Sequence, residues 1–530
     1  MKWAALLALA AVLTACTGGG EREPAEREPA EREPAAQPPA LAPAMPLPDN
    51  AVAGAVARLD GIAADLMSSS GIPGLAVAVV HGGKTLYAKG FGVRDTRSDE
   101  PVDAGTVFQL ASLSKPIAAT VVAQQVGAGV ITWDTPVVDT LPWFALSDPS
   151  VTRMVTVGDF FAHRSGLPDH AGDVLEDLGY DRRAVLERMR LLPLAPFRTS
   201  YAYTNFGVTA AAEAVATAAG RDWADLSEQV LYRPLGMSTA SSRFADFQSR
   251  PDRAVGHVKV DGAYQPRYTR DPDAQSPAGG VSASVQDMAS WLAMVLADGN
   301  HNGTAIVDPT ALLPALTPQL VSNPPDEPAE RSGFYGYGFN ISTSPAGRVR
   351  FSHSGAFELG AATNFVIIPA ADVAIVALTN AAPMGVAETL TAEFADLVEF
   401  GEVRQDWRSL YRDAFAGLDK PFGELAGKTP PVNPVPSGPP SRYVGSYAND
   451  YWGPATVAEK DGALTLSLGP RPETYPLKHW DADTFTMSFV SENFPPRGVS
   501  QVSFRGDEMS VEFLDENRMG TFVHEERGPR

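Results

Sequence analysis

A serine and a lysine stand three residues apart at the predicted start of a helix. Ser112 and Lys115 would share one face of that helix, so the lysine ammonium can reach the serine hydroxyl. Pro116 lacks an amide hydrogen and is tolerated only in a first turn, which places the start of the helix near Ser112. Unpaired N–H groups and the helix dipole favour an oxyanion there, and a desolvated lysine can take the serine proton. The pair predicts a nucleophilic serine.

The Ser-x-x-Lys pattern is unspecific by itself, because average composition produces about one match in a chain of this length. The alternative is a helix-capping serine beside a solvated lysine. Two features favour the catalytic interpretation. No other lysine has a serine three positions before it, and a strand-like segment, residues 107–110, leads into the helix.

Seven further motifs follow Ser112-Leu113-Ser114-Lys115, and together they resemble a known family. They are Trp133-Asp134-Thr135-Pro136-Val137, His163-Arg164-Ser165-Gly166-Leu167, Tyr203-Thr204-Asn205, Pro234-Leu235-Gly236-Met237, Pro277-Ala278-Gly279-Gly280-Val281, Tyr335-Gly336-Tyr337-Gly338-Phe339 and His353-Ser354-Gly355. In this order they resemble the serine β-lactamase and penicillin-binding-protein superfamily, in its class C-like branch, over roughly residues 51–400. That branch also contains D-alanyl-D-alanine carboxypeptidases, D-aminopeptidases and family VIII carboxylesterases. Residues 441–530 resemble the lipocalin-like domain that often follows such hydrolases.

The resemblance implies catalytic roles for three matched residues. Ser112 is the nucleophile, and Lys115 and Tyr203 move protons. Tyr203 would act as general base and later as general acid, either as a phenolate beside Lys115 or through a hydrogen-bonded network. Asn205 would donate to the amide carbonyl of the substrate and contact Lys115.

The motif His353-Ser354-Gly355 is predicted to lie on a strand across the cleft from Ser112. The resemblance implies that the N–H groups of Ser112 and Ala356 form an oxyanion hole. It also implies that His353 and Gly355 bind substrate, with the glycine allowing a close backbone approach. Class C β-lactamases have Lys-Thr-Gly at this point, whereas a histidine with a reference pKa of about 6.5 is only partly charged. The motif therefore resembles the peptidase and esterase members more than efficient β-lactamases.

Other candidate motifs are interpreted as structural or are missing. Tyr447-Ala448-Asn449 is a second Tyr-x-Asn, but it follows all the other motifs and is interpreted as a surface turn. His163 and His170 flank a loop and are kept out of the catalytic set. The sequence contains neither the Ser-Asp-Asn of class A β-lactamases nor the Gly-x-Ser-x-Gly of α/β-hydrolases, which argues against both.

Composition limits the remaining possibilities. The chain has 530 residues, 44% of them hydrophobic, as expected for globular domains. Its 42 basic and 63 acidic side chains give a net charge of −21, which argues against nucleic-acid binding. One cysteine excludes disulfides within the chain and thiolate metal sites, and the eight histidines form no recognisable metal motif. We predict neither a metal nor an organic cofactor.

The N-terminus predicts a processing signal and a tether. Lys2 precedes an apolar run and then Leu13-Thr14-Ala15-Cys16, which resembles the lipobox of bacterial lipoproteins, where the cysteine is acylated. The alternative is an ordinary secretory signal with an incidental cysteine. Three Glu-Arg-Glu-Pro-Ala repeats and more prolines follow, and such sequence forms a semi-extended spacer rather than a core. We expect an extracytoplasmic, lipid-anchored protein, at the outer membrane and facing the periplasm.

The sequence predicts an α+β fold of the β-lactamase/transpeptidase type followed by a small all-β domain. Apolar, β-rich runs at 75–80, 85–91, 348–352, 362–368 and 373–379 flank a long helical region, so an antiparallel sheet should form from both ends of the domain. A helix from Asn50 to Gly71 should pack on it. The expected divisions are a signal peptide (1–15), a lipid-attached tether (16–49), a hydrolase domain (50–420), a proline-rich linker (421–440) and a lipocalin-like β-domain (441–530).

The predicted function is hydrolysis of amide or ester bonds through an acyl-enzyme. The substrate would be a small molecule or peptide, such as a D-amino-acid-containing peptide or a small ester. Two alternatives stay open at this point: a class C-like β-lactamase, and a non-catalytic cell-wall or penicillin-binding sensor. Apart from substrate, the only partner predicted is a membrane, contacted through the lipid anchor.

Overall fold

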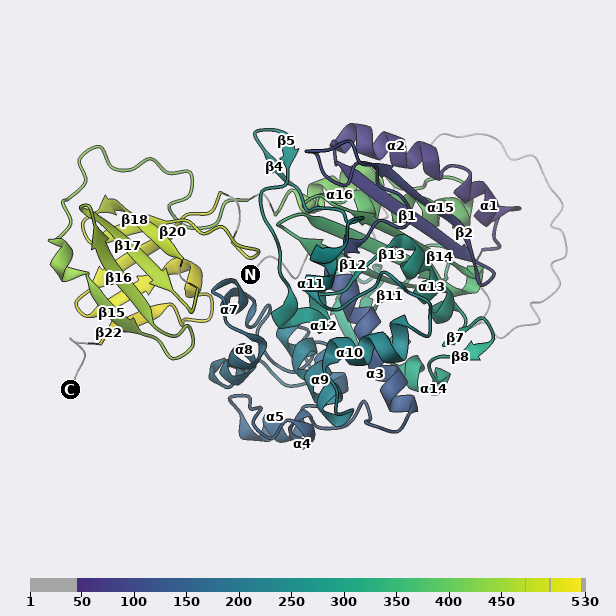
Figure 1. Cartoon of the computed structure of the whole chain (residues 1–530), viewed down its shortest axis with the longest axis horizontal. Helices are drawn as coiled ribbons and strands as arrows, with labels where there is room; N and C mark the ends of the chain where they lie inside the picture. The colour runs from purple at the N-terminus through teal and green to yellow at the C-terminus, as the bar shows by residue number, and fades with distance from the viewer. Residues whose placement is uncertain (1–44, 419, 472, 495–496, 526–530) are drawn as a thin grey trace.

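The computed structural model describes residues 45–418, 420–471, 473–494 and 497–525. Within these ranges the chain forms a large α+β domain followed by a closed β-barrel (Figure 1), which confirms the predicted fold class. The predicted signal peptide, Cys16 and most of the predicted tether lie outside the described residues. Among the helices in the described ranges, none is long and apolar enough to cross a membrane.

The large domain is built on an antiparallel sheet of eight strands, in the order β2-β1-β14-β13-β12-β11-β10-β9. Their bounds are β1 Gly74–His81, β2 Lys84–Gly92, β9 Leu320–Asn323, β10 Gly333–Tyr335, β11 Asn340–Thr343, β12 Val349–Phe357, β13 Ala361–Ile368 and β14 Val373–Thr379. Leu75 lies opposite Thr379, so the first strand pairs with the last. The predicted assembly of the sheet from both ends of the domain is confirmed, with the β1–β2 hairpin at one edge.

The sheet separates two hydrophobic cores, because alternate residues of a strand face opposite sides. Val77 of β1 contributes to the core shared with α1, α2 and α15, whereas its neighbour Ala78 contributes to the core shared with α3 and α13. The helices on the first side, at the top of Figure 1, are α1 Ala51–Val56, α2 Leu59–Ser70, α15 Val386–Phe400 and α16 Trp407–Phe415.

The first helix differs from the prediction. It is interrupted after Val56 and resumes at Leu59, and Asn50 precedes it in a left-handed conformation without a side-chain cap. The predicted end is correct: Gly71 closes α2 with a φ of 73°, a conformation that favours glycine. Both pieces still bury their apolar faces in one core.

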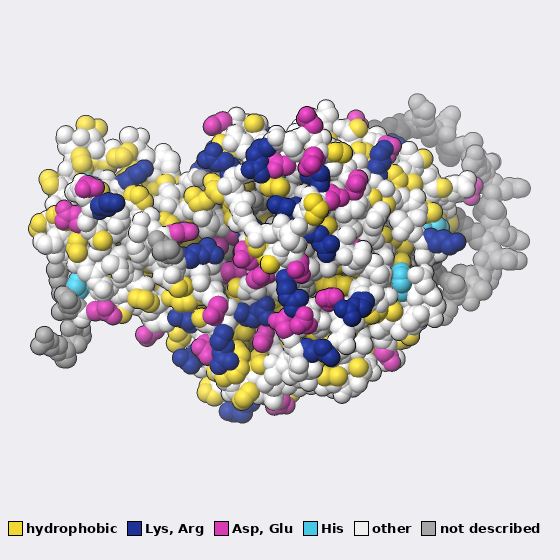
Figure 2. Space-filling model, viewed as in Figure 1, with side chains coloured by type: hydrophobic (Ala, Val, Ile, Leu, Met, Phe, Trp, Pro, Cys, Tyr) yellow, Lys and Arg dark blue, Asp and Glu magenta, His cyan; other side chains and the backbone are white. Residues whose placement is uncertain are grey.

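The other face of the sheet carries the helical subdomain. Its helices are α3 Ser114–Gly127, α4 Val137–Thr140, α5 Pro149–Met154, α6 Val157–Phe161, α7 Asp173–Asp177, α8 Arg182–Arg188, α9 Asn205–Ala218, α10 Trp223–Ser227, α11 Phe244–Ser249, α12 Ser276–Gly279, α13 Val285–Leu296 and α14 Pro309–Leu312. Three short strand pairs complete it: β3 Phe108–Gln109 with β6 Ser282–Ala283, β4 Val258–Val260 with β5 Ala263–Gln265, and β7 Asn300–His301 with β8 Thr304–Ala305. Acidic and basic side chains are interspersed over the face shown in Figure 2.

The C-terminal barrel closes through eight antiparallel strands. They are β15 Gly445–Ala448, β16 Ala455–Lys460, β17 Ala463–Leu468, β18 Thr474–Asp481, β19 Thr484–Met487, β20 Ser500–Arg505, β21 Glu508–Val511 and β22 Thr521–His524, and β22 pairs back with β15. Buried aromatic side chains fill the interior, among them Tyr443, Phe485 and Phe504, whose rings contact one another.

Three aromatic residues of this domain lie elsewhere than predicted. The hydrophobic residues of this domain predict strands at Phe489 and Phe513, but Phe489 lies in a loop and Phe513 in a short 3-10 helix. Both join a cluster with Phe422 and Phe494, because large rings can bury their area against one another outside a strand. Tyr447 is not in a surface turn: it is a buried residue of β15.

Candidate active site

The serine of the Ser-x-x-Lys motif lies in a tight turn between β3 and α3. Residues Ala111–Leu113 form one 3-10 turn, and the α-helix itself begins at Ser114, two residues after the predicted start. Ala111 has a φ of 48°, a left-handed conformation that costs a non-glycine residue on the order of 1 kcal/mol. The Ser114 hydroxyl stabilises this turn, since it donates to the Ala111 carbonyl oxygen (2.7 Å) and accepts from the Val281 N–H (2.9 Å).

The structure brings Ser112, Lys115 and Tyr203 together. Lys115 Nζ lies 2.9 Å from Ser112 Oγ, and the Tyr203 hydroxyl donates to the same oxygen over 2.8 Å. Lys115 is fully buried and has two more partners, Asn205 Oδ1 at 2.6 Å and the Ala278 carbonyl oxygen at 3.0 Å. Its Nζ also lies 4.5 Å from the centre of the Tyr203 ring. Two proton-transfer groups therefore converge on one hydroxyl.

Burial assigns different protonation states to these two groups. It lowers the pKa of Lys115 to about 7, against the opposing charge of Asp173. It raises the pKa of Tyr203 well above its ordinary value, so the resting hydroxyl keeps its proton. Of the two arrangements considered for Tyr203, a phenolate and a hydrogen-bonded network, the geometry and burial favour the network. A neutral lysine is the base that this site can offer near neutral pH.

Asn205 is held by the carboxylate of Asp173, a residue that no sequence motif indicated. Asp173 Oδ2, at the start of α7, accepts from Asn205 Nδ2 (2.8 Å) and from His170 Nδ1 (2.7 Å). Burial disfavours the charged form of His170, but the hydrogen bond to Asp173 and the charges of Asp173 and Asp169 together outweigh burial, so the pKa of His170 is raised. Asn205 opens α9 and turns its oxygen to Lys115, so Asp173 fixes the orientation of the amide. His170 was noted in the sequence because it flanks a loop. Asp173 belongs to no motif, and its spacing gave no reason to select it.

His353 lies on β12 but presents a neutral ring. The Tyr335 hydroxyl is 2.8 Å from Nε2, and Nδ1 lies 2.6 Å from the Ser354 carbonyl oxygen. Because a carbonyl only accepts, Nδ1 carries the proton and Nε2 accepts from Tyr335. Burial, aided by the charge of Lys115, lowers the pKa of His353 to about 3. His353 is therefore neutral at physiological pH. Its reference pKa had instead predicted a partly charged ring.

Gly355 lies directly against the turn that carries the serine. A Cβ atom there would be 2.3 Å from the Leu110 carbonyl oxygen and 3.0 Å from the Ser112 nitrogen. Thr363 of β13 donates to the same carbonyl (2.8 Å). The predicted oxyanion residues Ser112 and Ala356 thus belong to two segments that are held in close contact.

Aromatic rings form the wall behind Tyr203. The His163 ring lies 4.5 Å from Tyr203 and 4.9 Å from Tyr335, and its Nδ1 accepts from the Thr204 N–H. Burial lowers the pKa of His163 well below its ordinary value. His163 contacts Tyr203 through its ring. The sequence contains the motif Tyr335-Gly336-Tyr337-Gly338-Phe339, to which no function was assigned. This motif was the one signal that could have indicated Tyr335 as a neighbour of the site.

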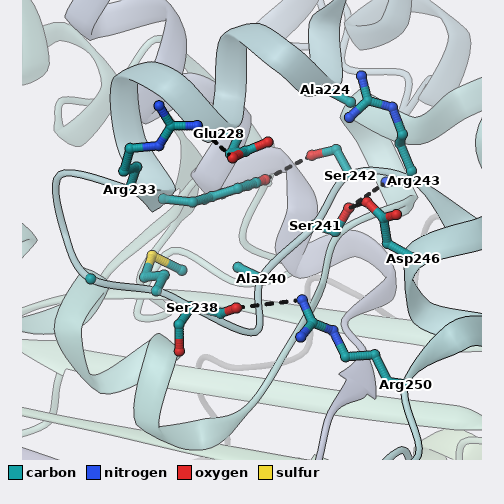
Figure 3. A pocket seen from close by; sticks show the side chains of 13 residues that line it. Ala224, Glu228, Arg233, Ser238, Ala240, Ser241, Ser242, Arg243, Asp246 and Arg250 are labelled. Carbon is teal, nitrogen blue, oxygen red and sulfur yellow. Dashed lines mark hydrogen bonds and ion pairs between the residues drawn. The ribbon is translucent and has the colours of Figure 1, made fainter.

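A pocket of about 420 Å³ lies apart from this cluster, around the π-helix Glu228–Tyr232 that follows α10 (Figure 3). Its charged side chains are paired with neighbours: Arg233 with Glu228, and Asp246 with the Ser241 hydroxyl. Ser112, Lys115 and Tyr203 do not line it. The cluster of Ser112, Lys115 and Tyr203 therefore lies outside this pocket.

Comparison with known proteins agrees with this geometry. The Beta-lactamase family matches residues 59–399. The chain belongs to this family. A second family, described as a domain of unknown function (DUF3471), matches residues 429–525, which include the barrel.

Relatives with named activities are hydrolases. The unguisins hydrolase ungD of Aspergillus violaceofuscus is 27% identical over 433 residues, covering 75% of this chain and 74% of the relative. The esterase EstB of Burkholderia gladioli is 26% identical over 382 residues, covering 65% of this chain and 95% of the relative. The structure of the octameric penicillin-binding protein homologue from Pyrococcus abyssi matches with a TM-score of 0.58 and 19% identity, covering 88% of this chain and 99% of that one, which shows the shared fold. The protein is a serine hydrolase of the β-lactamase and penicillin-binding-protein superfamily.

Proposed function

We propose that this protein hydrolyses small amide or ester substrates through an acyl-enzyme on Ser112. The observation that carries the proposal is the convergence of Lys115 Nζ and the Tyr203 hydroxyl on Ser112 Oγ, at 2.9 and 2.8 Å. A serine hydroxyl becomes an effective nucleophile when a positioned base takes its proton. The intact set of nucleophile, base and second proton carrier also argues against a non-catalytic sensor.

The proposed reaction assigns each group one step. Neutral Lys115 takes the Ser112 proton as Oγ bonds to the substrate carbonyl carbon, and the N–H groups of Ser112 and Ala356 hold the resulting oxyanion. The carbon–nitrogen or carbon–oxygen bond then breaks. The proton passes through the Tyr203 hydroxyl to the leaving amine or alcohol. Water repeats these steps on the acyl-enzyme, releases the acid and restores Ser112.

The charges around the site favour substrates without a carboxylate near the reacting bond. Neutral His353 occupies the position where class C β-lactamases carry a lysine, so it supplies no positive charge. Two carboxylates, Asp169 and Asp173, lie beside Tyr203 and Asn205. An amine-bearing D-aminoacyl amide or a small neutral ester fits these charges better than a β-lactam, whose carboxylate would meet no cation at His353.

A substrate panel tests the proposal. We expect the wild type to turn over an activated butyrate ester or a D-alanine anilide at least tenfold faster than a chromogenic cephalosporin. The Ser112→Ala variant should lose this turnover. Equal rates in wild type and Ser112→Ala would contradict the proposed nucleophile, whereas faster cephalosporin hydrolysis would favour the β-lactamase alternative.

We also propose that the mature protein is attached to a membrane by lipid on Cys16. The support is the Leu13-Thr14-Ala15-Cys16 sequence and the proline-rich spacer that follows it. Expression in a bacterial host with metabolic labelling by an alkyne fatty acid should label the wild type and not the Cys16→Ser variant. Equal labelling of both would contradict acylation at this cysteine.

A further inference from the structure

The barrel is joined to the large domain by close contacts around α7 and α8. Gly453 and Gly179 both adopt positive φ at this interface, and an added Cβ would lie 2.0 Å from the Tyr180 hydroxyl and 2.3 Å from Arg471 Cγ, respectively. The Tyr180 hydroxyl donates to the Trp452 carbonyl oxygen (2.9 Å). Such tight backbone approaches require a fixed relative position of the two domains.

One loop of the barrel reaches further, toward the end of the central sheet. Its described residues, 488–494 and 497–499, lie between β19 and β20, and Figure 1 shows them projecting from the barrel toward the large domain. Asn493 on this loop donates to Asp177 of α7 through its backbone N–H (3.1 Å) and Nδ2 (2.9 Å). The neighbouring side chain, Glu492, points to a different element.

Glu492 accepts two backbone N–H groups from the turn between β12 and β13. Its Oε1 accepts from Glu358 (2.7 Å) and its Oε2 from Leu359 (3.3 Å). This turn follows directly on Phe357, the last residue of β12, and Ala356 is the residue before that. A carboxylate from the barrel therefore holds the end of the strand to which the oxyanion hole is assigned.

A buried arginine balances the charge of this carboxylate. Arg270 Nε lies 3.8 Å from Glu492 Oε2, and Nη2 of the same side chain donates to Glu176 of α7. The Arg270 guanidinium also lies 5.1 Å from the centre of the Phe357 ring. Burial raises the pKa of Glu492, whereas the charge of Arg270 and the hydrogen bond from the Glu358 amide favour the carboxylate that accepts both N–H groups. The cluster links the barrel, α7 and β12 at one point.

We propose that Glu492 is a positioning residue for catalysis: by binding the amides of Glu358 and Leu359, it fixes the end of β12 and the N–H of Ala356 that stabilises the oxyanion. The inference rests on the proposed function, because it assigns Ala356 to the oxyanion hole. A carboxylate offers two acceptors to the two amides, whereas a glutamine offers one and places an NH₂ group against the other amide. Without either acceptor, two N–H groups lose the side chain that pairs with them, and the turn can shift.

Kinetics of Glu492 variants test the proposal on the full-length enzyme. With the activated butyrate ester, Glu492→Gln should lower kcat about 10-fold and Glu492→Ala about 100-fold, since a displacement near 1 Å in an active site can cost that much. KM should stay within about twofold, because the acyl side of the cleft is unchanged. Glu473→Gln alters an exposed barrel glutamate bonded to Tyr475 and should leave kcat unchanged.

A second control separates positioning from docking of the barrel. Asn493→Ala removes a bond to Asp177 from the same loop but leaves Glu492 in place, so it should lower the melting temperature and not kcat. An equal loss of kcat in Asn493→Ala and Glu492→Ala would overturn the proposal, because the effect would then come from a loosened barrel. Unchanged kcat in both Glu492 variants would also overturn it.

Hydrogen exchange tests the contact independently of turnover. The amides of Glu358 and Leu359 should exchange faster in Glu492→Gln than in wild type, and at the wild-type rate in Asn493→Ala. Equal exchange in Glu492→Gln and wild type would contradict the positioning role. If the wild type itself formed no acyl-enzyme while the exchange difference was present, the proposed function would fail and the contact would stand.

Discussion

The same short motif, Tyr-x-Asn, occurs once in each domain and has different partners in the two places. In the large domain, Tyr203 donates to Ser112 Oγ and Asn205 binds Lys115. In the barrel, the Tyr447 hydroxyl donates to the backbone carbonyl of Tyr443. There Asn449 spans two loops: its Nδ2 donates to two backbone carbonyls, and its Oδ1 accepts from two backbone N–H groups, those of residues 451 and 452.

The difference shows that the motif acquires chemistry only from the side chains around it. Both tyrosines are buried, at 3% and 2% exposure, so burial alone does not separate them. What separates them is a serine hydroxyl and an ionisable amine within hydrogen-bond distance of the first motif, whereas the tyrosine hydroxyl and the asparagine amide of the second bond to backbone groups.

Removing the two hydroxyls should separate the motifs most clearly. Tyr203→Phe should lower kcat about 10³-fold, within the range for loss of a proton-transfer group. Tyr447→Phe should keep wild-type kcat and lose about 1 kcal/mol of unfolding free energy, the usual contribution of one hydrogen bond. Steady-state kinetics and denaturant unfolding measure the two effects. Comparable activity losses in both variants would remove the contrast.

Gly355→Ala tests how closely β12 must approach the nucleophile. The new Cβ would clash with the Leu110 carbonyl oxygen at 2.3 Å, so strand and turn must separate. We expect kcat to fall about 100-fold, because the oxyanion donors lose their alignment. Gly462→Ala, in a barrel hairpin with open space around it, is the matched control and should affect stability only. Wild-type kcat in Gly355→Ala would show that the contact is dispensable.

The two asparagine variants should differ in the same way as the two tyrosine variants: the one in the large domain should lose activity, and the one in the barrel should lose stability. Asn205→Ala should lower kcat about 30-fold, since Lys115 loses the partner that orients it. Asn449→Ala should instead lower the unfolding free energy by about 2 kcal/mol through its lost backbone partners, with kcat within about threefold of wild type. The ratio of kcat loss to stability loss in each variant is the measurement. A similar ratio in both would argue against distinct roles.

The pH profile should report the lysine of the large domain. Because burial lowers the pKa of Lys115 to about 7, the neutral amine accumulates above that pH and the base is lost below it. We expect kcat/KM to be constant above about pH 8 and to fall about tenfold per pH unit below about pH 6. A profile that stays flat down to pH 5 would contradict Lys115 as the base.

Local patterns made much of the large domain predictable. The β1–β2 hairpin follows from an apolar run, a Gly-Gly turn and a second run, and α3 follows from Pro116 and the apolar residues after it. The break after Val56 could not be read from periodicity, because both pieces keep their apolar residues on one side. In the barrel, Phe489 and Phe513 were assigned to strands because hydrophobicity alone does not distinguish a strand from an aromatic cluster.

The groups around the Ser112 cluster were less accessible to sequence reasoning than Ser112, Lys115 and Tyr203 themselves. Ser112, Lys115 and Tyr203 were selected as candidates because they stand in short motifs, and the structure brings them together. Asp173 belongs to no motif, and its role arises from a contact with Asn205 that only the folded chain creates. The role of Glu492 was even less predictable from the sequence, because its partners are backbone amides 134 and 133 residues away along the chain.

Intact-protein mass spectrometry tests the central claim most directly. A protein starting near Asp49 would be exposed briefly to penicillin and, separately, to an activated butyrate ester, with Ser112→Ala treated in parallel. Our account predicts a mass increase equal to the acyl group in the wild type, mapped by proteolysis to the peptide containing Ser112, and no increase in the alanine variant. Adducts on both proteins, or on neither with either reagent, would contradict Ser112 as the nucleophile of an acyl-enzyme.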